Sequence, residues 1–139
     1  MSGPKPEVKG QKRAMPIAAL EIFTAAGIAL FWAAWFAGSL APENPPACYF
    51  AFERAFPVPD LVLALSLLAA GILLLKGRPA GRALSLACAG ALVFLGLLDA
   101  SFNFQNGIYS ASATDLAMNG LLNLWCVGLG AAILGRLRQ

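Results

Sequence analysis

Side chains that carry oxygen recur at helical spacing on both sides of a turn in the second half of the chain. Asp99 and Asn103 stand four residues apart before the turn, and Asp115, Asn119 and Asn123 follow it at intervals of four. Residues four apart share one face of a helix, so each set predicts a polar row along a helix. Because consecutive helices are usually neighbours, we expect the two rows to face each other.

These rows predict a polar cleft that reaches into apolar surroundings. At 1.5 Å per residue, Asn123 lies about 12 Å deeper than Asp115. An unsatisfied amide is costly in hydrocarbon, so these groups must meet one another, water or a ligand. An alternative stays open, in which Asn119 and Asn123 only join helices through hydrogen bonds. The ligand-binding residues that we predict are Asp99, Asn103, Asn106, Tyr109, Asp115, Asn119, Asn123 and Glu53.

Three kinds of chemistry suit such a cleft. An all-oxygen cluster suits a hard cation, an acidic cleft under aromatic side chains suits a cationic amphiphile or a sterol-like lipid, and a buried carboxylate suits proton transfer. The chain has no histidine, which is the usual ligand of haem iron and zinc. Its three cysteines form no C-x-x-C motif. We therefore predict a site without a cofactor, and we assign no residue to a metal or to catalysis.

The composition indicates that a membrane is the solvent of this chain. Of its 139 residues, 59% are hydrophobic and only 12% are charged, and the mean hydropathy is +0.71. A soluble domain of this length has about 25% charged residues. The net charge of +3 is small and its basic residues form no single face, so we expect no nucleic-acid partner.

The apolar runs predict an all-α fold, an integral membrane four-helix bundle with spans at about 16–40, 60–75, 83–104 and 114–134. Residues 1–15 form a basic tail, and residues 16–139 form the single transmembrane domain. The aromatic segment 48–56 predicts a short interfacial helix in the first outside loop, or a lid on the bundle.

Local signals predict where several elements begin and end. Asp60 is expected to cap the second span, and Ser112-x-x-Asp115 to cap the fourth. Asn106-Gly107 predicts the turn after the third span. Pro16 suits a first helical turn, so Glu21 is expected about one turn inside the membrane surface, where it is solvated or paired with a basic residue.

Charge predicts the orientation. Four spans put both termini on one side, and only Arg54 among the basic residues falls on the other. The positive-inside rule makes both termini cytoplasmic, in a plasma membrane or a bacterial inner membrane. A bacterial source is indicated only by the high content of Ala, Leu and Gly. The basic residues on the cytoplasmic side are Lys5, Lys9, Lys12, Arg13, Lys76, Arg78, Arg82, Arg136 and Arg138, and the acidic ones outside are Glu43, Glu53, Asp60, Asp99 and Asp115.

The layout of four spans, cytoplasmic termini and outer carboxylates is similar to that of the EXPERA group of sterol isomerases and sigma-2-like receptors. This resemblance concerns architecture, and no residue motif carries it. The first prediction is a protein that binds, or transports, a small or amphipathic ligand from the non-cytoplasmic side. The alternatives are a membrane-embedded sterol or lipid isomerase, and an accessory subunit of a larger membrane complex. The expected partners are the bilayer, the ligand, and either further copies of the chain or such a complex.

Overall fold

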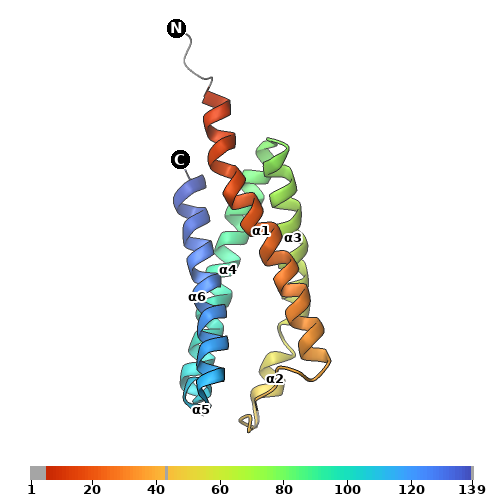
Figure 1. Ribbon diagram of the computed structural model, residues 1–139, viewed down its shortest axis with the longest axis vertical. Coiled ribbons are helices and arrows are strands. Elements are labelled where there is room, and N and C mark those ends of the chain that lie inside the picture. The colour runs from red at the N-terminus through yellow and green to blue at the C-terminus, as the bar shows by residue number, and fades with distance from the viewer. Residues whose placement is uncertain (1–5, 43, 139) are drawn as a thin grey trace.

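The computed structural model describes the backbone of residues 6–42 and 44–138, and side chains within those ranges from Gly10 onward. Every regular element in these ranges is a helix (Figure 1). The predicted all-α class is therefore confirmed for the described residues. Lys5 and Glu43, which enter the charge count, lie outside them. The elements are α1 (Pro6–Phe36), α2 (Tyr49–Glu53), α3 (Pro57–Leu75), α4 (Pro79–Gln105), α5 (Ile108–Ala111) and α6 (Ala113–Leu137).

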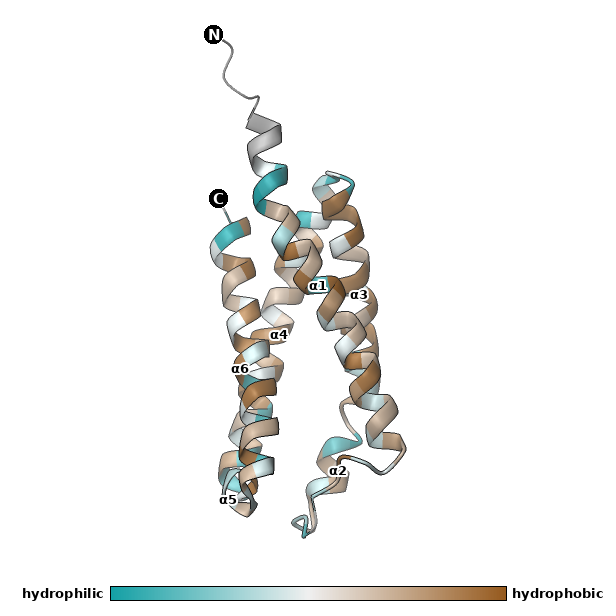
Figure 2. Ribbon diagram, in the orientation of Figure 1, coloured by the Kyte–Doolittle hydropathy of each residue, from teal (hydrophilic) through white to brown (hydrophobic). Residues whose placement is uncertain are grey.

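Four of the helices, α1, α3, α4 and α6, are long and apolar enough to cross a membrane. Hydrophilic residues gather at the end of the bundle that holds both termini and the α3–α4 turn, and apolar residues fill the middle (Figure 2). Large apolar side chains also face outward, with Leu30 71%, Phe94 69% and Leu124 72% exposed. Such a surface suits a hydrocarbon solvent. The four predicted spans thus correspond to four helices of suitable length.

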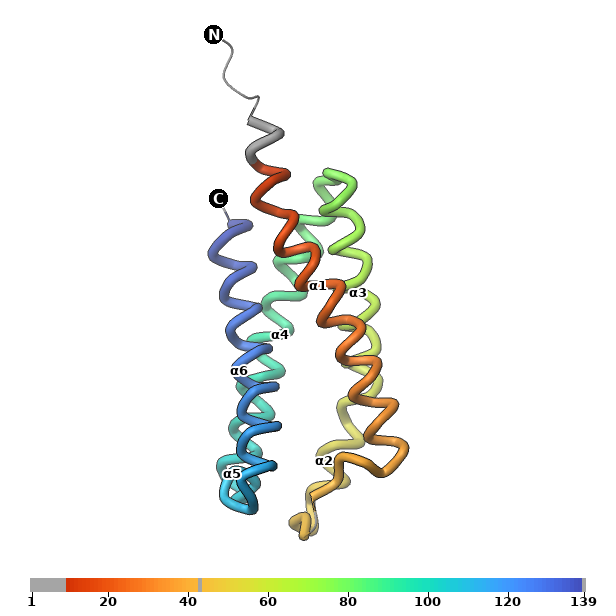
Figure 3. Tube along the Cα trace, viewed as in Figure 1, coloured from red at the N-terminus to blue at the C-terminus, as the bar shows by residue number. Residues whose placement is uncertain are grey.

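The long helices form two antiparallel pairs, α1 with α3 and α4 with α6, and α3 also packs on α4. Glycine allows the close approach within each pair. A Cβ on Gly71 of α3 would lie 2.9 Å from the Ala18 carbonyl oxygen, and one on Gly130 of α6 would lie 2.7 Å from that of Ala89. The pairs stay together near the termini and separate toward the opposite end (Figure 3).

The apolar core occupies the half of the bundle near the termini. Ile17, Leu67, Leu92 and Ile133 each come from a different long helix, and each is at most 1% exposed. No comparable apolar cluster fills the other half among the described residues. That half contains the polar rows, α2 and α5, so the separation of the helix pairs there leaves room for a site.

Two of the expected boundaries were wrong. Helix α1 begins at Pro6 and contains Pro16 in its interior, so Glu21 lies far from the helix start and is 0% exposed. Helix α3 begins at Pro57, with Phe56 as its N-cap. A proline at the first helical position loses no hydrogen bond, so Pro57 can start the helix three residues before Asp60. The Asp60 side chain is thereby free to act elsewhere.

Other local predictions were confirmed. The Ser112 hydroxyl oxygen accepts a 3.0 Å hydrogen bond from the Asp115 backbone N–H and caps α6. Helix α4 ends at Gln105, and Gly107 has a φ of +70°, a conformation that glycine adopts without strain. The predicted helix in segment 48–56 corresponds to α2, which covers Tyr49–Glu53.

Candidate functional site

A cavity of about 510 Å³ lies between the two helix pairs, in the half of the bundle opposite the termini. Its wall is mostly apolar and aromatic, with Phe31, Trp32, Phe56 and Trp125 among the lining side chains. A volume of this size accommodates a small organic molecule. The cavity exists because the apolar core fills only the half of the bundle near the termini, and the helix pairs separate in the other half.

Three carboxylates line this cavity and come from different elements. Glu53 belongs to α2, Asp60 to α3 and Asp99 to α4. They are near enough to interact electrostatically with one another. None of the described lining residues is basic. Negative charge on three neighbouring carboxyl groups in an apolar wall is costly, so the cavity favours either protons on these groups or a positively charged occupant.

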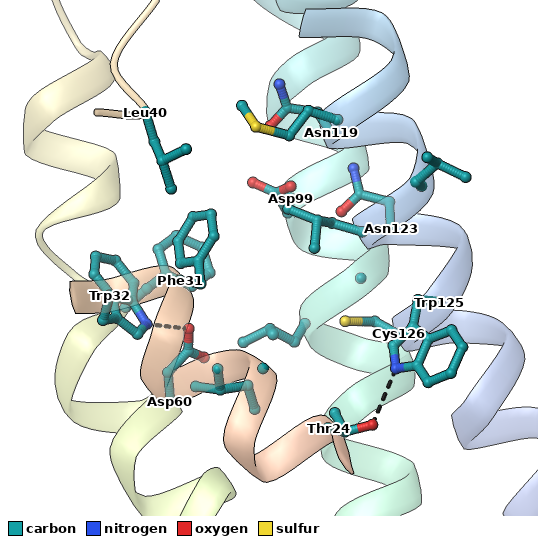
Figure 4. Close-up of a pocket in the computed structure, with 18 of the residues that line it drawn as sticks. Thr24, Phe31, Trp32, Leu40, Asp60, Asp99, Asn119, Asn123, Trp125 and Cys126 are labelled. Carbon is teal, nitrogen blue, oxygen red and sulfur yellow. Dashed lines mark hydrogen bonds between the residues drawn. The ribbon is translucent and has the colours of Figure 1, made fainter. Parts of the chain in front are cut away.

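Asp60 is the most deeply buried of the three, with 8% exposure. The Trp32 indole N–H of α1 donates a 2.8 Å hydrogen bond to Asp60 Oδ2 (Figure 4). The other oxygen, Oδ1, is buried and has no hydrogen-bond partner among the described residues. A buried carboxylate oxygen without a partner is costly. Asp60 is therefore a cavity-lining carboxyl group with one of its two oxygens left unpaired.

Asp99 stands on the opposite wall of the cavity (Figure 4). Asn103 of the same helix donates a 2.9 Å hydrogen bond to Asp99 Oδ2. Asn103 is 1% exposed and does not line the cavity. Asn119 and Asn123 of α6 line the wall beside Asp99. The predicted rows of α4 and α6 are thus adjacent, and Asn103 acts behind Asp99.

Helix α2 closes the outer end of the gap between the pairs. The Phe52 ring stacks on Phe102 of α4 with centroids 3.8 Å apart and planes 5° from parallel. The Cys48 thiol donates a 3.4 Å hydrogen bond to Asn106 Oδ1. Because Glu53 lies on the same short helix, docking of α2 brings its carboxylate to the cavity.

The floor of the cavity is a contact between α1 and α6. The Trp125 indole N–H donates a 3.0 Å hydrogen bond to Thr24 Oγ1 (Figure 4). The Thr24 hydroxyl in turn donates a 2.7 Å bond to the Leu20 carbonyl oxygen. The Phe23 ring meets the edge of the Trp125 ring at 5.7 Å. These residues separate the cavity from the apolar core.

The cavity is open to the side between α1 and α6. Four of its lining residues are also exposed on the apolar surface: Phe23 at 66%, Leu121 at 68%, Leu122 at 40% and Trp125 at 39%. An opening rimmed by apolar side chains suits a hydrocarbon solvent. The cavity can therefore be reached from this apolar surface without first crossing α2.

The structure separates the sequence-predicted site residues into two groups. Those that line the cavity are Glu53, Asp99, Asn119 and Asn123. The remaining four do not line it, and they make structural contacts. Asp115 accepts a 2.7 Å bond from the Ser112 hydroxyl, Asn106 donates to the Phe102 carbonyl oxygen, and Tyr109 accepts a 2.6 Å bond from Asn123. Tyr109 and Asn123 also border a smaller groove of about 360 Å³ between α4 and α6.

Sequence reasoning missed Asp60, Thr24 and Trp125 as site residues. The sequence indicated only a helix cap at Asp60, whose side chain is 8% exposed and lines the cavity. Glu21 and Thr24, one turn apart in an apolar run, were the signal that one face of α1 points inward. Among the described residues, no three Cys, Asp or Glu side chains are grouped so that they could hold a metal ion.

Fold and site together define a helical bundle with four candidate membrane spans and an acidic, aromatic cavity that opens onto its apolar surface. In comparisons with known proteins, no protein family, no curated protein and no solved structure matches the chain.

Proposed function

We propose that this chain is a membrane protein that binds a cationic amphiphile in the cavity between its two helix pairs. The observation that carries the proposal is Asp60, which lines the cavity beside Trp32 opposite Asp99 and keeps one buried carboxyl oxygen unpaired. A positive head group pairs with the Asp60 carboxylate and reduces the repulsion among the three carboxylates. The apolar part of the same molecule fills the aromatic wall.

The orientation follows from the basic residues. Lys12, Arg13, Arg136 and Arg138 lie at the end of the bundle that holds the termini, opposite the cavity. The positive-inside rule then places the termini in the cytoplasm and the cavity in the outer half of the membrane. The side opening between α1 and α6 faces the outer leaflet, so an amphiphile approaches through the lipid rather than through water.

Binding is tested with two lipophilic ions of the same shape and opposite charge, tetraphenylphosphonium and tetraphenylborate. The full chain is reconstituted in nanodiscs of neutral lipid, and the fluorescence of its tryptophans is followed, because Trp32 and Trp125 line the cavity. We expect the cation to bind at least about tenfold more tightly than the anion, a difference of about 1.4 kcal/mol. Equal affinity for the two ions would refute the proposal.

Variants then locate the binding. Asp60→Asn removes one charge from the cavity and is expected to raise the Kd of the cation about tenfold. The matched control is Asp115→Asn, because Asp115 is an acidic residue at the same end of the bundle but does not line the cavity. An unchanged Kd in Asp60→Asn and in Asp99→Asn would place the cation elsewhere.

A membrane-embedded isomerase is the second candidate, supported by two carboxylates on opposite walls of one apolar cavity. One can accept a proton from a bound sterol-like molecule while the other donates one. In that case Asp60→Asn or Asp99→Asn removes turnover of the sterol but keeps its binding. Loss of cation binding without any turnover in the unaltered protein favours the binding function.

A further inference from the structure

Glu21 is a carboxyl group in the interior of the core, outside the cavity. It is 0% exposed, and neither of its oxygens has a hydrogen-bond partner among the described residues. At 1.5 Å per residue it lies roughly 12 Å along α1 from Arg13, the nearest charged residue before it, and roughly 22 Å from Phe36, the end of the helix. Both distances place it within the hydrocarbon layer, where an unpaired ionised carboxylate is strongly disfavoured.

A second polar side chain without a partner faces Glu21 from α4. Ser85 is 0% exposed, and its hydroxyl also has no hydrogen-bond partner among the described residues. The two side chains nevertheless lie close enough to interact. A carboxylate and a hydroxyl that are both left unpaired in an apolar core are not explained by packing. They form an isolated polar pair inside the apolar core.

The groups around this pair offer no described cation. Cys88, one turn after Ser85 on α4, is the titratable neighbour of Glu21. Arg82, one turn before Ser85, has an exposed side chain. Helix α3 packs here through Gly71 against Ala18 and Ile22. The remaining members of the core at this level are apolar, and they include Leu129 and Ile133 of α6.

We propose that Glu21 and Ser85 form a proton-binding site. The carboxylate takes a proton from hydronium, so that one O–H bond forms on Glu21 and one breaks in hydronium, which becomes water. The resulting carboxyl O–H donates to the Ser85 hydroxyl oxygen, which gives each side chain one hydrogen-bond partner. This site rests on the contacts of the core and is independent of the ligand proposed for the cavity.

The route of the proton runs through the cavity floor. Thr24 stands one turn from Glu21 on the same face of α1, and it lines the cavity whereas Glu21 does not. The Trp125–Thr24 hydrogen bond therefore lies between the water-accessible cavity and the site. Opening this contact connects Glu21 with the outer side, and restoring it isolates the proton in the core.

Infrared difference spectroscopy of the full chain in lipid vesicles at neutral pH tests the site. We expect the unaltered protein to show the carbonyl stretch of a protonated carboxyl group, Glu21→Gln to lose it, and Ser85→Ala to shift it. Asp115→Asn is the control and leaves that band in place. A protein in which Glu21→Gln removes carboxylate bands instead, or changes neither set of bands, would overturn the proposal.

Two further measurements cover the remaining outcomes. If Glu21→Gln does not fold, the band of the unaltered protein and its shift in Ser85→Ala decide the question, and an unshifted band would count against the site.

Transfer into heavy water then tests the route. We expect Trp125→Phe, which loses the indole donor, to exchange the carboxyl proton several-fold faster. An unchanged exchange rate would overturn the route through the floor.

Discussion

Substitution of Gly130 by alanine tests the close packing of α4 on α6, the pair that forms one wall of the cavity. The added Cβ would lie 2.6 Å from Val93 Cγ2 and 2.7 Å from the Ala89 carbonyl oxygen. The valine methyl can rotate away, but the carbonyl oxygen belongs to the backbone of α4. The two helices must therefore move apart along the contact.

The size of the effect follows from two opposing contributions. Overpacking of a well-packed contact costs about 1–3 kcal/mol. Alanine favours a helix interior over glycine by about 1 kcal/mol. For Gly130→Ala we expect a net loss of about 1–2 kcal/mol, because the backbone carbonyl cannot yield cheaply. Gly128 of the same helix has no atom within 4 Å of an added Cβ, so Gly128→Ala should gain up to about 1 kcal/mol.

The assay is reversible unfolding in mixed micelles with increasing dodecyl sulfate, followed by circular dichroism. Both variants change the same residue type on the same helix, so helix propensity and hydrophobicity are matched. The difference between them, about 1–3 kcal/mol, isolates the interhelical contact. If Gly130→Ala unfolds at the same denaturant fraction as Gly128→Ala, or at a higher one, α6 does not pack on α4 as described.

Two further predictions concern polar contacts of α6 and use the same unfolding assay. Tyr109→Phe removes the hydroxyl oxygen that accepts a 2.6 Å hydrogen bond from the Asn123 amide, a side chain that is 7% exposed. The expected loss of unfolding free energy is about 1–3 kcal/mol. A loss near zero would mean that Asn123 finds another acceptor. Ser112→Ala removes the α6 N-cap that binds the Asp115 backbone and should cost about 1 kcal/mol, whereas Ser110→Ala, an exposed position in α5, is the control and should cost little.

Hydrophobicity was sufficient to predict the four long helices, because each apolar run is long enough to form one candidate span. The turn at Asn106 and the cap at Ser112 were predicted for the same local reason, since both depend on residues only a few positions apart. The start of α1 could not be read in this way. Pro16 reads as a helix start, yet the backbone continues through it, and the helix is long enough to tolerate the lost bond.

The candidate site was predictable on one wall only. Asp99, Asn119 and Asn123 share helical faces of neighbouring helices, and periodicity finds such rows. Asp60 and Trp32 are 28 positions apart and meet only because α1 and α3 pack closely at Gly71. Pairing across helices depends on rotation about each helix axis, which the hydrophobic pattern of a lipid-exposed helix specifies weakly.

The satisfaction of hydrogen bonds separates structural polar residues from functional ones in this bundle. The Asp115 carboxylate accepts a hydrogen bond from the Ser112 hydroxyl, and the Asp115 backbone N–H donates to the Ser112 hydroxyl oxygen. The Asn119 amide donates to the Asp115 carbonyl oxygen at 2.9 Å. Their donors serve the local fold, as expected for polar groups near a helix start.

Asp60 and Glu21 differ from these residues because each keeps at least one buried carboxyl oxygen unpaired. Polar atoms left unpaired in an apolar setting are retained against a cost in stability. The two carboxyl groups lie on different sides of the Thr24–Trp125 contact, Asp60 in the cavity and Glu21 in the core. The two proposals thus put a charged ligand and a bound proton on the two sides of one hydrogen bond between α1 and α6, and opening that bond would connect them.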